Sequence, residues 1–189
     1  QEIIGYLNQL NDLLCPVWVE GKAVVYRTNW HPAGCPARTP DETRPGSYTV
    51  DIGSAGDERF IGWGWHWSEE IAGLTLRWAG AYPQTDLYID LPPGTYSGEI
   101  VAQAFWEPRQ LQFFINGEAV STKWRVQPGN LQTFTFTLPA DTIGTGQHLK
   151  LTLAYDAVIV PAEVGQSADP RQLAIAVDRL TFTRQAEGS

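Results

Sequence analysis

The stretch Phe60–Trp78, FIGWGWHWSEEIAGLTLRW, holds four of the chain's eight tryptophans. Trp63, Trp65 and Trp67 recur at a spacing of two, which on an extended strand points all three indole rings to one face. One interpretation is a core position, because aromatic rings favour strands and bury a large area. The other is a stacking platform for sugar rings. We expect that some of the eight tryptophans are exposed.

Outside this stretch, short segments of alternating apolar and polar residues follow one another at intervals of roughly eight to twelve residues, as in all-β proteins. TFTFTL at 133–138 and QHLKLTLAY at 147–155 alternate strictly, and Asn116-Gly117 is a strong hairpin signal. Repeated hairpins exclude a parallel α/β sheet, because parallel strands need crossover helices. We therefore predict an all-β fold, an antiparallel β-sandwich of the jelly-roll, galactose-binding-like kind with one short N-terminal helix.

The helix is predicted over residues 2–14, where apolar residues follow helical spacing up to Pro16. A length of 189 residues predicts a single domain. We expect an N-terminal extension over 1–59, a sandwich core over 60–183 and a tail over 184–189. Because the sequence starts at Gln1 and contains no Met, we interpret it as a processed chain or an excised domain of a longer protein.

The net charge of −8 argues against nucleic acid as a partner, because phosphate backbones require a basic face. No apolar run is long enough to span a membrane. The only cysteines, Cys15 and Cys35, are expected to form a disulfide worth about 3 kcal/mol, with two buried free thiols as the alternative. A disulfide fits an oxidising, extracytoplasmic location, in which the chain is secreted, periplasmic or at the cell surface.

Metal and catalytic sites receive little support from the sequence. A zinc site from Cys15, His31, Cys35 and His66 would match no closed zinc module, so we predict no metal ligand set. A structural calcium ion stays open, because carboxylates can pin loops. The acids that could serve it lie in turns or at strand ends: Asp51, Asp57, Glu58, Asp156 and Asp169.

No nucleophile motif is present, and we predict that the chain is not an enzyme. A small jelly-roll glycoside hydrolase or lyase is the lesser alternative. Such an enzyme needs two facing carboxylates, and the neighbouring Glu69 and Glu70 point opposite ways on a strand.

The order of short motifs carries a resemblance to a known family. Gly62-Trp63 is followed by Glu69-Glu70, by Arg77-Trp78, by Ile115-Asn116-Gly117, and by DPRQLAIAV at 169–177. This order resembles the jelly-roll, carbohydrate-binding-module-like domains found alongside bacterial glycosyltransferases and other cell-envelope glycan proteins. The resemblance covers about residues 60–182 and omits the first 59. Ala174 stands where the family pattern has glycine.

The resemblance implies a non-catalytic carbohydrate-binding or accessory domain, with glycan as the ligand and a larger membrane-associated parent protein as a further partner. We expect Arg171 and Asp169 to lie near Glu69 and Arg77, as a structural clamp or a polar sugar site. The competing hypothesis is a protein–protein interaction module, because aromatic and Arg residues also mark interfaces. The candidate ligand-binding residues are Trp63, Trp65, Trp67, Arg77, Tyr82, Trp106, Trp124, Asp169 and Arg171.

Overall fold

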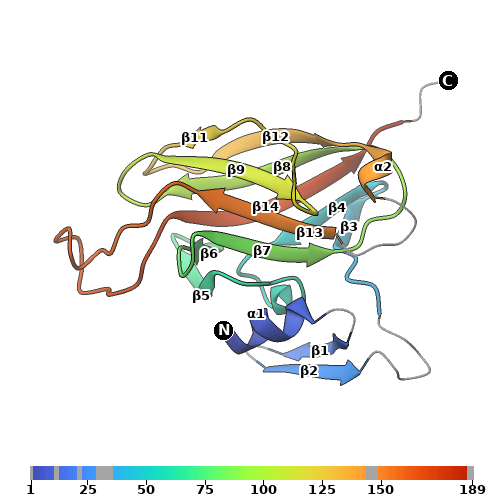
Figure 1. Cartoon of the computed structure of the whole chain (residues 1–189), viewed down its shortest axis with the longest axis horizontal. Coiled ribbons are helices and arrows are strands. Elements are labelled where there is room, and N and C mark those ends of the chain that lie inside the picture. Colours follow the sequence, from blue (N-terminus) through green and yellow to red (C-terminus); the bar gives the residue numbers. More distant parts are fainter. Residues whose placement is uncertain (1, 11–12, 21–22, 29–35, 144–148, 187–189) are drawn as a thin grey trace.

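The structure is a computed structural model that describes residues 2–10, 13–20, 23–28, 36–143 and 149–186. Two antiparallel sheets lie face to face (Figure 1). One has the strand order β12-β8-β14-β4-β3, with β6 paired to β14 and β5 to β6; the other has the order β10-β9-β13-β7, with β11 paired to β9. The strands of these sheets are β3 (Asp41–Arg44), β4 (Ser47–Asp51), β5 (Trp65–Ile71), β6 (Leu74–Ala79), β7 (Gln84–Ile89), β8 (Tyr96–Ala104), β9 (Arg109–Ile115), β10 (Glu118–Ala119), β11 (Trp124–Val126), β12 (Gln132–Leu138), β13 (Leu149–Tyr155) and β14 (Ile175–Arg184).

The core lies between the two sheets and follows from the alternation seen in the sequence. Leu149, Leu151 and Leu153 of β13 are fully buried, and they belong to one cluster with residues of both sheets, including Ile100 and Phe182 of the other layer. Because successive side chains of a strand point to opposite faces, the residues between these leucines lie on the outer face of the sheet. The predicted jelly-roll β-sandwich is confirmed.

The predicted hairpin at Asn116-Gly117 is also confirmed. Both residues have positive φ, of 50° and 87°, which is the backbone of a two-residue turn that matches strand twist. The turn joins β9 to β10, whose residues pair in antiparallel register. In the other layer, β3 forms the edge of the larger sheet next to β4.

The N-terminal extension contains α1 (Glu2–Gln9) and a separate two-stranded sheet of β1 (Leu14–Glu20) and β2 (Ala23–Thr28). The helix is shorter than predicted, because Leu14 is already paired with Thr28 in that sheet. Gly5 lies so close to the sandwich that a Cβ on it would be 2.3 Å from Gly62 O. Close packing, rather than helix propensity, therefore explains this glycine.

Asn8 anchors α1 to the sandwich. Its side chain is fully buried, and its amide donates to the carbonyl of Glu58 at 2.9 Å and to that of Ile61. The hydroxyl of Tyr26 in β2 donates to Asn8 Oδ1 at 2.8 Å. One polar side chain thus ties the helix, the small sheet and the sandwich together.

Two short helices, neither of them expected from the sequence, complete the fold: the 3-10 helix η1 (Asp57–Arg59) and α2 (Ala140–Ile143). None of the helices within the described residues is long and apolar enough to cross a membrane. Cys15 is buried in β1, whereas Cys35 lies outside the described residues, so the disulfide stays a prediction. His31, a member of the weighed zinc set, also lies outside them.

Candidate functional site

The three tryptophans spaced two apart do not share one face. Trp65 begins β5, is 3% exposed and donates its indole N–H to the carbonyl of Asp86 at 2.7 Å. Trp67 is 38% exposed, because a bulge between Trp65 and Ser68 in the pairing of β5 with β6 changes the alternation. Trp63 lies before the strand, in a turn. The prediction of a three-ring platform is therefore wrong, and Trp65 is a core residue.

Trp124 also packs against the chain's own rings. It is half-buried in β11, and its ring stacks on Phe134 at a centroid distance of 5.3 Å and on Phe113 at 6.4 Å. These rings extend the core between the sheets. We assign Trp124 a packing role rather than the predicted sugar-stacking role.

Arg77 lies fully buried, away from solvent, and was expected beside Arg171. Its Nε and Nη2 donate to the two carboxylate oxygens of Asp57 at 2.7 and 2.5 Å, and Nη2 also donates to Glu58 Oε1 at 2.9 Å. Both acids belong to η1 and are 2% and 4% exposed. Because a buried arginine needs such partners, Arg77 is a structural residue of the core and not a ligand contact.

Arg171, Asp169 and Glu69 do come together, as expected. The guanidinium of Arg171 donates to Asp169 Oδ2 at 2.7 Å through Nη2 and to Glu69 Oε1 at 2.5 Å through Nη1. About a third of the Arg171 side chain is exposed. This cluster ties the long β13–β14 loop, which projects from one end of the sandwich in Figure 1, to β5.

His66 supports the same loop from the side of β5. Its Nε2 donates to the carbonyl of Gln172 at 2.7 Å, which places the proton of the neutral ring on that nitrogen. Burial lowers the pKa of His66, and the positive charge of Arg171 lowers it further. The hydrogen bond from the Arg171 side chain lowers the pKa of Asp169. Both shifts favour the ionisation states that the cluster requires.

Replacing Arg171 by alanine is expected to leave the sandwich folded and to loosen this loop. The ion pairs are one-third exposed, so the loss in free energy of unfolding should stay below about 1 kcal/mol. Limited proteolysis should cut faster within residues 157–170. Arg179→Ala is the control, because Arg179 pairs only with its sequence neighbour Asp178 among the described residues. Global unfolding of Arg171→Ala would contradict this account.

Trp106 is exposed at the same end of the sandwich as the β13–β14 loop. It is 51% exposed in the β8–β9 loop and has φ of +58°, a backbone that costs an ordinary residue about 1–2 kcal/mol. The preceding Phe105 donates its backbone N–H to Ala174 at 2.9 Å, and its ring packs edge-on against Trp78. The loop is thus fixed while the indole of Trp106 faces solvent.

Tyr82 lines a hollow at the loop end of the smaller sheet, and its ring packs against that of Trp63. Their rings lie 4.6 Å apart between centroids, and both residues are half-buried. We name this hollow, of about 230 Å³, the loop-end hollow. Its lining residues are Gly80, Ala81, Tyr82, Pro83, Tyr155, Asp156, Ala157, Val158 and Gln172.

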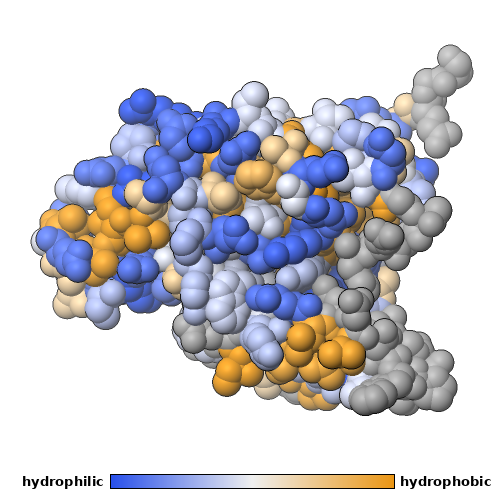
Figure 2. Space-filling view, viewed as in Figure 1, coloured by the Kyte–Doolittle hydropathy of each residue, from blue (hydrophilic) through white to orange (hydrophobic). Residues whose placement is uncertain are grey.

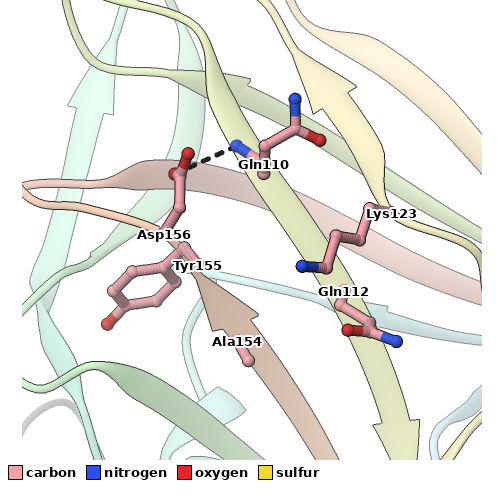
Figure 3. A pocket seen from close by; sticks show the side chains of 6 residues that line it. All are labelled: Gln110, Gln112, Lys123, Ala154, Tyr155 and Asp156. Carbon is pink, nitrogen blue, oxygen red and sulfur yellow. Dashed lines mark hydrogen bonds between the residues drawn. The ribbon is translucent and has the colours of Figure 1, made fainter.

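A second hollow, the middle hollow of about 140 Å³, adjoins the first. Figure 3 shows the side chains that line the middle hollow. It lies on the outer face of the sheet and shares Tyr155 and Asp156 with the loop-end hollow. Lys123 extends from beyond β9 toward these two residues (Figure 3). The carboxylate of Asp156 accepts the backbone N–H of Gln110 at 3.0 Å. The lining residues are Gln110, Gln112, Lys123, Ala154, Tyr155 and Asp156.

A third hollow, the turn-end hollow of about 480 Å³, continues toward the β9–β10 turn and shares Ala154 with the middle hollow. It is lined by Gln84, Phe114, Asn116, Gly117, Lys150, Thr152 and Ala154. The floor is low because Thr152 and Ala154 of β13 are small and face outward. Thr152 lies between Asp86 of β7 and Phe114 of β9. Ala154 lies between Gln84 of β7 and Gln112 of β9. We name the three adjoining hollows together the β13 groove.

The hydrogen-bonding residues of this groove were not identified from the sequence. Gln110 and Gln112 alternate with buried Leu111 and Phe113, so a polar outer face of β9 could have been expected. Which other strands lie beside that face could not. Of the candidate residues predicted from the sequence, only Tyr82 lines the groove, and Trp63 packs against it. Trp106, Asp169 and Arg171 lie in the β8–β9 and β13–β14 loops, outside the lining of the groove.

The five acids considered for calcium do not form one ligand cluster. Asp57 pairs with Arg77, Asp169 with Arg171, and Asp156 with a backbone N–H. Burial raises the pKa of Asp51, and the nearby acids Asp178 and Asp57 raise it further. Within the described ranges, no three His, Cys, Asp or Glu side chains are grouped as a metal site would require.

Comparison with known proteins yields no match to a family model and no match among curated proteins. Among solved structures, a Paenibacillus xanthan lyase aligns with a TM-score of 0.50 and 12% identity, over 86% of this chain and 15% of the lyase. A Podospora anserina GH26-CBM35 β-(1,4)-mannanase aligns with a TM-score of 0.48 and 12% identity, over 77% of this chain and 29% of that one. A family 35 carbohydrate-binding module from Clostridium thermocellum aligns with a TM-score of 0.46 and 12% identity, over 72% of this chain and 98% of the module.

This chain therefore spans less than a third of the mannanase. Carbohydrate-binding modules of families 36, 6 and 22 are also among the similar structures. At such identities the likeness to the xanthan lyase concerns the fold alone, which is the jelly-roll sandwich described above.

Proposed function

We propose that this chain is a non-catalytic carbohydrate-binding module, an accessory domain of an extracytoplasmic glycan-related protein, whose ligand lies along the β13 groove. One observation carries the proposal: three hollows adjoin along a single strand and share Tyr155, Asp156 and Ala154. Seven residues of strand span about 23 Å, at ~3.3 Å per residue. An open track of this length suits an extended oligosaccharide better than a compact metabolite.

The groove offers the chemistry that a sugar chain needs. Sugar rings present C–H faces, which pack on aromatic rings, and hydroxyls, which both donate and accept hydrogen bonds. Tyr82 at one end and Phe114 near the other supply half-buried rings. Between them the side-chain amides of Gln84, Gln110 and Gln112 can each donate and accept. A ligand with many hydroxyls can therefore be held without a metal ion.

The same lining favours binding over hydrolysis. Hydrolysis of a glycosidic bond requires two carboxyl groups on either side of the bond, at most about 10 Å apart. Among the described residues that line the three hollows, Asp156 is the only carboxylate. It already accepts a hydrogen bond from the Gln110 backbone. A single engaged carboxylate supports the assignment of a binding module.

Filling the groove is expected to weaken glycan binding strongly without unfolding the protein. Ala154 is half-buried and lies where two hollows meet, so Ala154→Phe would place a ring across the track. We expect the affinity for any glycan that the wild-type protein binds on a polysaccharide panel to fall at least about tenfold, or 1.4 kcal/mol. Affinity electrophoresis in native gels measures this.

The matched control is Thr135→Phe, which adds the same ring to an exposed strand position on the other sheet. It should bind like the wild-type protein. Equal affinity of Ala154→Phe and wild type for the same glycan would exclude the β13 groove as the site. Silence of the wild-type protein across the whole panel would remove the carbohydrate proposal.

A protein-interaction module is the second candidate, and the surface of the N-terminal extension favours it. Apolar surface lies over α1 in Figure 2, where Ile3 is 73% exposed and Tyr6 55%; Leu13, just after the helix, is 61% exposed. Exposed apolar groups gathered in one place mark interaction sites. Co-purification of a partner that is lost in Ile3→Ser/Leu13→Ser, together with no response to glycans, would favour this candidate.

A further inference from the structure

The lysines of this chain are unevenly placed. The sequence has three, Lys22, Lys123 and Lys150, in a chain with a net charge of −8. Two of them, Lys123 and Lys150, line the β13 groove, one in the middle hollow and one in the turn-end hollow. The question is whether either lysine has a charge left over for a ligand.

The two lysines differ in how far their charge is compensated. Lys150 Nζ lies 3.1 Å from Asp86 Oδ2, and the other oxygen of Asp86 accepts the hydroxyl of Thr152 at 2.7 Å. The charge of Lys150 is thus balanced within the sheet. Lys123 is exposed and has no hydrogen bond or ion pair with another residue that the structure describes.

A second cation stands next to Lys123. Arg125 of β11 is paired directly with Gln110 of β9, and paired residues of adjacent strands project from the same face of a sheet. Arg125 is exposed and likewise unpaired within the described part of the chain. The side of the groove near β11 therefore carries two uncompensated positive charges.

Asp156 is the negative group that lines the middle hollow together with Lys123. It forms no ion pair with Lys123 among the described contacts, and the Gln110 backbone occupies one of its oxygens. At physiological salt, charges beyond about 8 Å are screened, so the acidic remainder of the chain weighs little on a ligand held at this point. Arg125 lies beside this hollow, opposite Gln110, so Lys123 and Arg125 together outnumber the single acid Asp156 and the local balance favours an anion.

We infer that the β13 groove selects acidic glycans, with a sugar carboxylate or sulfate ester bound by Lys123 and Arg125. The inference rests on the proposed function and names its substrate class. The ammonium of Lys123 would donate to the anionic oxygens, while the amides of Gln110 and Gln112 hold neighbouring hydroxyls. Charge-assisted hydrogen bonds of this kind are stronger than neutral ones.

The test uses glycan pairs that share a backbone and differ in charge. Polygalacturonate and its methyl ester form the carboxylate arm, and dextran sulfate and dextran form the sulfate arm. Retardation in native gels at about 0.15 M salt is measured for the full chain and three variants. We expect the acidic member of at least one pair to bind at least about tenfold more tightly than the neutral member. The responding arm identifies the anion.

Lys123→Gln should remove most of that preference, and Lys123→Arg should keep it, because the charge is retained. Arg44→Gln is the matched control: Arg44 is exposed on β3 of the other sheet, and this change alters the net charge equally. Equal retention of acidic and neutral members, or a preference unchanged in Lys123→Gln, overturns the inference and leaves the proposed function standing. No retention by any glycan, in these pairs or on the wider panel, overturns both.

Discussion

Replacement of Arg77 by methionine is expected to lower the free energy of unfolding by about 3–5 kcal/mol, because it strands two buried carboxylates. Arg77 is fully buried and donates to both oxygens of Asp57 and to Glu58. Methionine fills a similar length but offers no donor. Glu58 Oε2 is already buried without a hydrogen-bond partner among the described residues. The substitution would also remove the hydrogen bond that Arg77 donates to the other oxygen of this carboxylate, Glu58 Oε1. Urea denaturation followed by tryptophan fluorescence measures the change.

A rescue variant separates lost charge pairing from lost packing. In Arg77→Met/Asp57→Asn/Glu58→Gln the buried charges are gone, and part of the stability should return, as replacing a whole buried ion pair is often tolerated. Arg44→Gln, an exposed arginine, should change the stability by less than about 0.5 kcal/mol. If Arg77→Met matched Arg44→Gln, the buried ion triad would not support the fold as described.

Replacement of Gly64 by alanine is expected to cost about 2–5 kcal/mol, the sum of backbone strain and steric overlap. Gly64 has φ of +89°, which L side chains rarely adopt. A Cβ there would lie 2.3 Å from the carbonyl oxygen of Gln84, at the start of β7. That oxygen is part of the backbone of β7, and Gln84 pairs with Ala154 of β13, so it cannot move without disturbing this pairing. The thermal midpoint and the free energy of unfolding both report the loss.

Gly73 provides a control that carries strain without overlap. It has φ of +80° in the β5–β6 turn, and nothing lies within 4 Å of the place where its Cβ would be. Gly73→Ala should therefore cost only about 1–2 kcal/mol. The excess cost of Gly64→Ala over Gly73→Ala measures the close approach to β7. Equal costs would show that the contact is not tight.

The cluster at the loop end shows how far local reasoning reaches. Arg171, Asp169 and Glu69 were expected together and are together. Arg77 was expected with them and is instead buried with Asp57. Alternation along β6 puts Arg77 on the face opposite Leu76 and Trp78, but alternation does not say which face is the core. In the structure, β6 pairs with β14, and η1 lies on the face of β6 from which Arg77 projects, so that Arg77 is buried against Asp57 and Glu58.

Local patterns in the sequence were enough to predict that the chain forms antiparallel strands, that it turns at Asn116-Gly117, and which residues of β12 and β13 alternate between faces. These features depend on neighbours within a few positions, and side-chain alternation and turn chemistry act over that range. Which tryptophans are exposed could not be predicted from these local patterns. A bulge in β5, where it pairs with β6, changes the side-chain alternation so that Trp67 faces solvent. The β13 groove likewise forms only in the tertiary structure. Gln84, Gln112 and Ala154 become neighbours only when β7, β13 and β9 pair in register, and register is set by contacts between strands far apart in the chain.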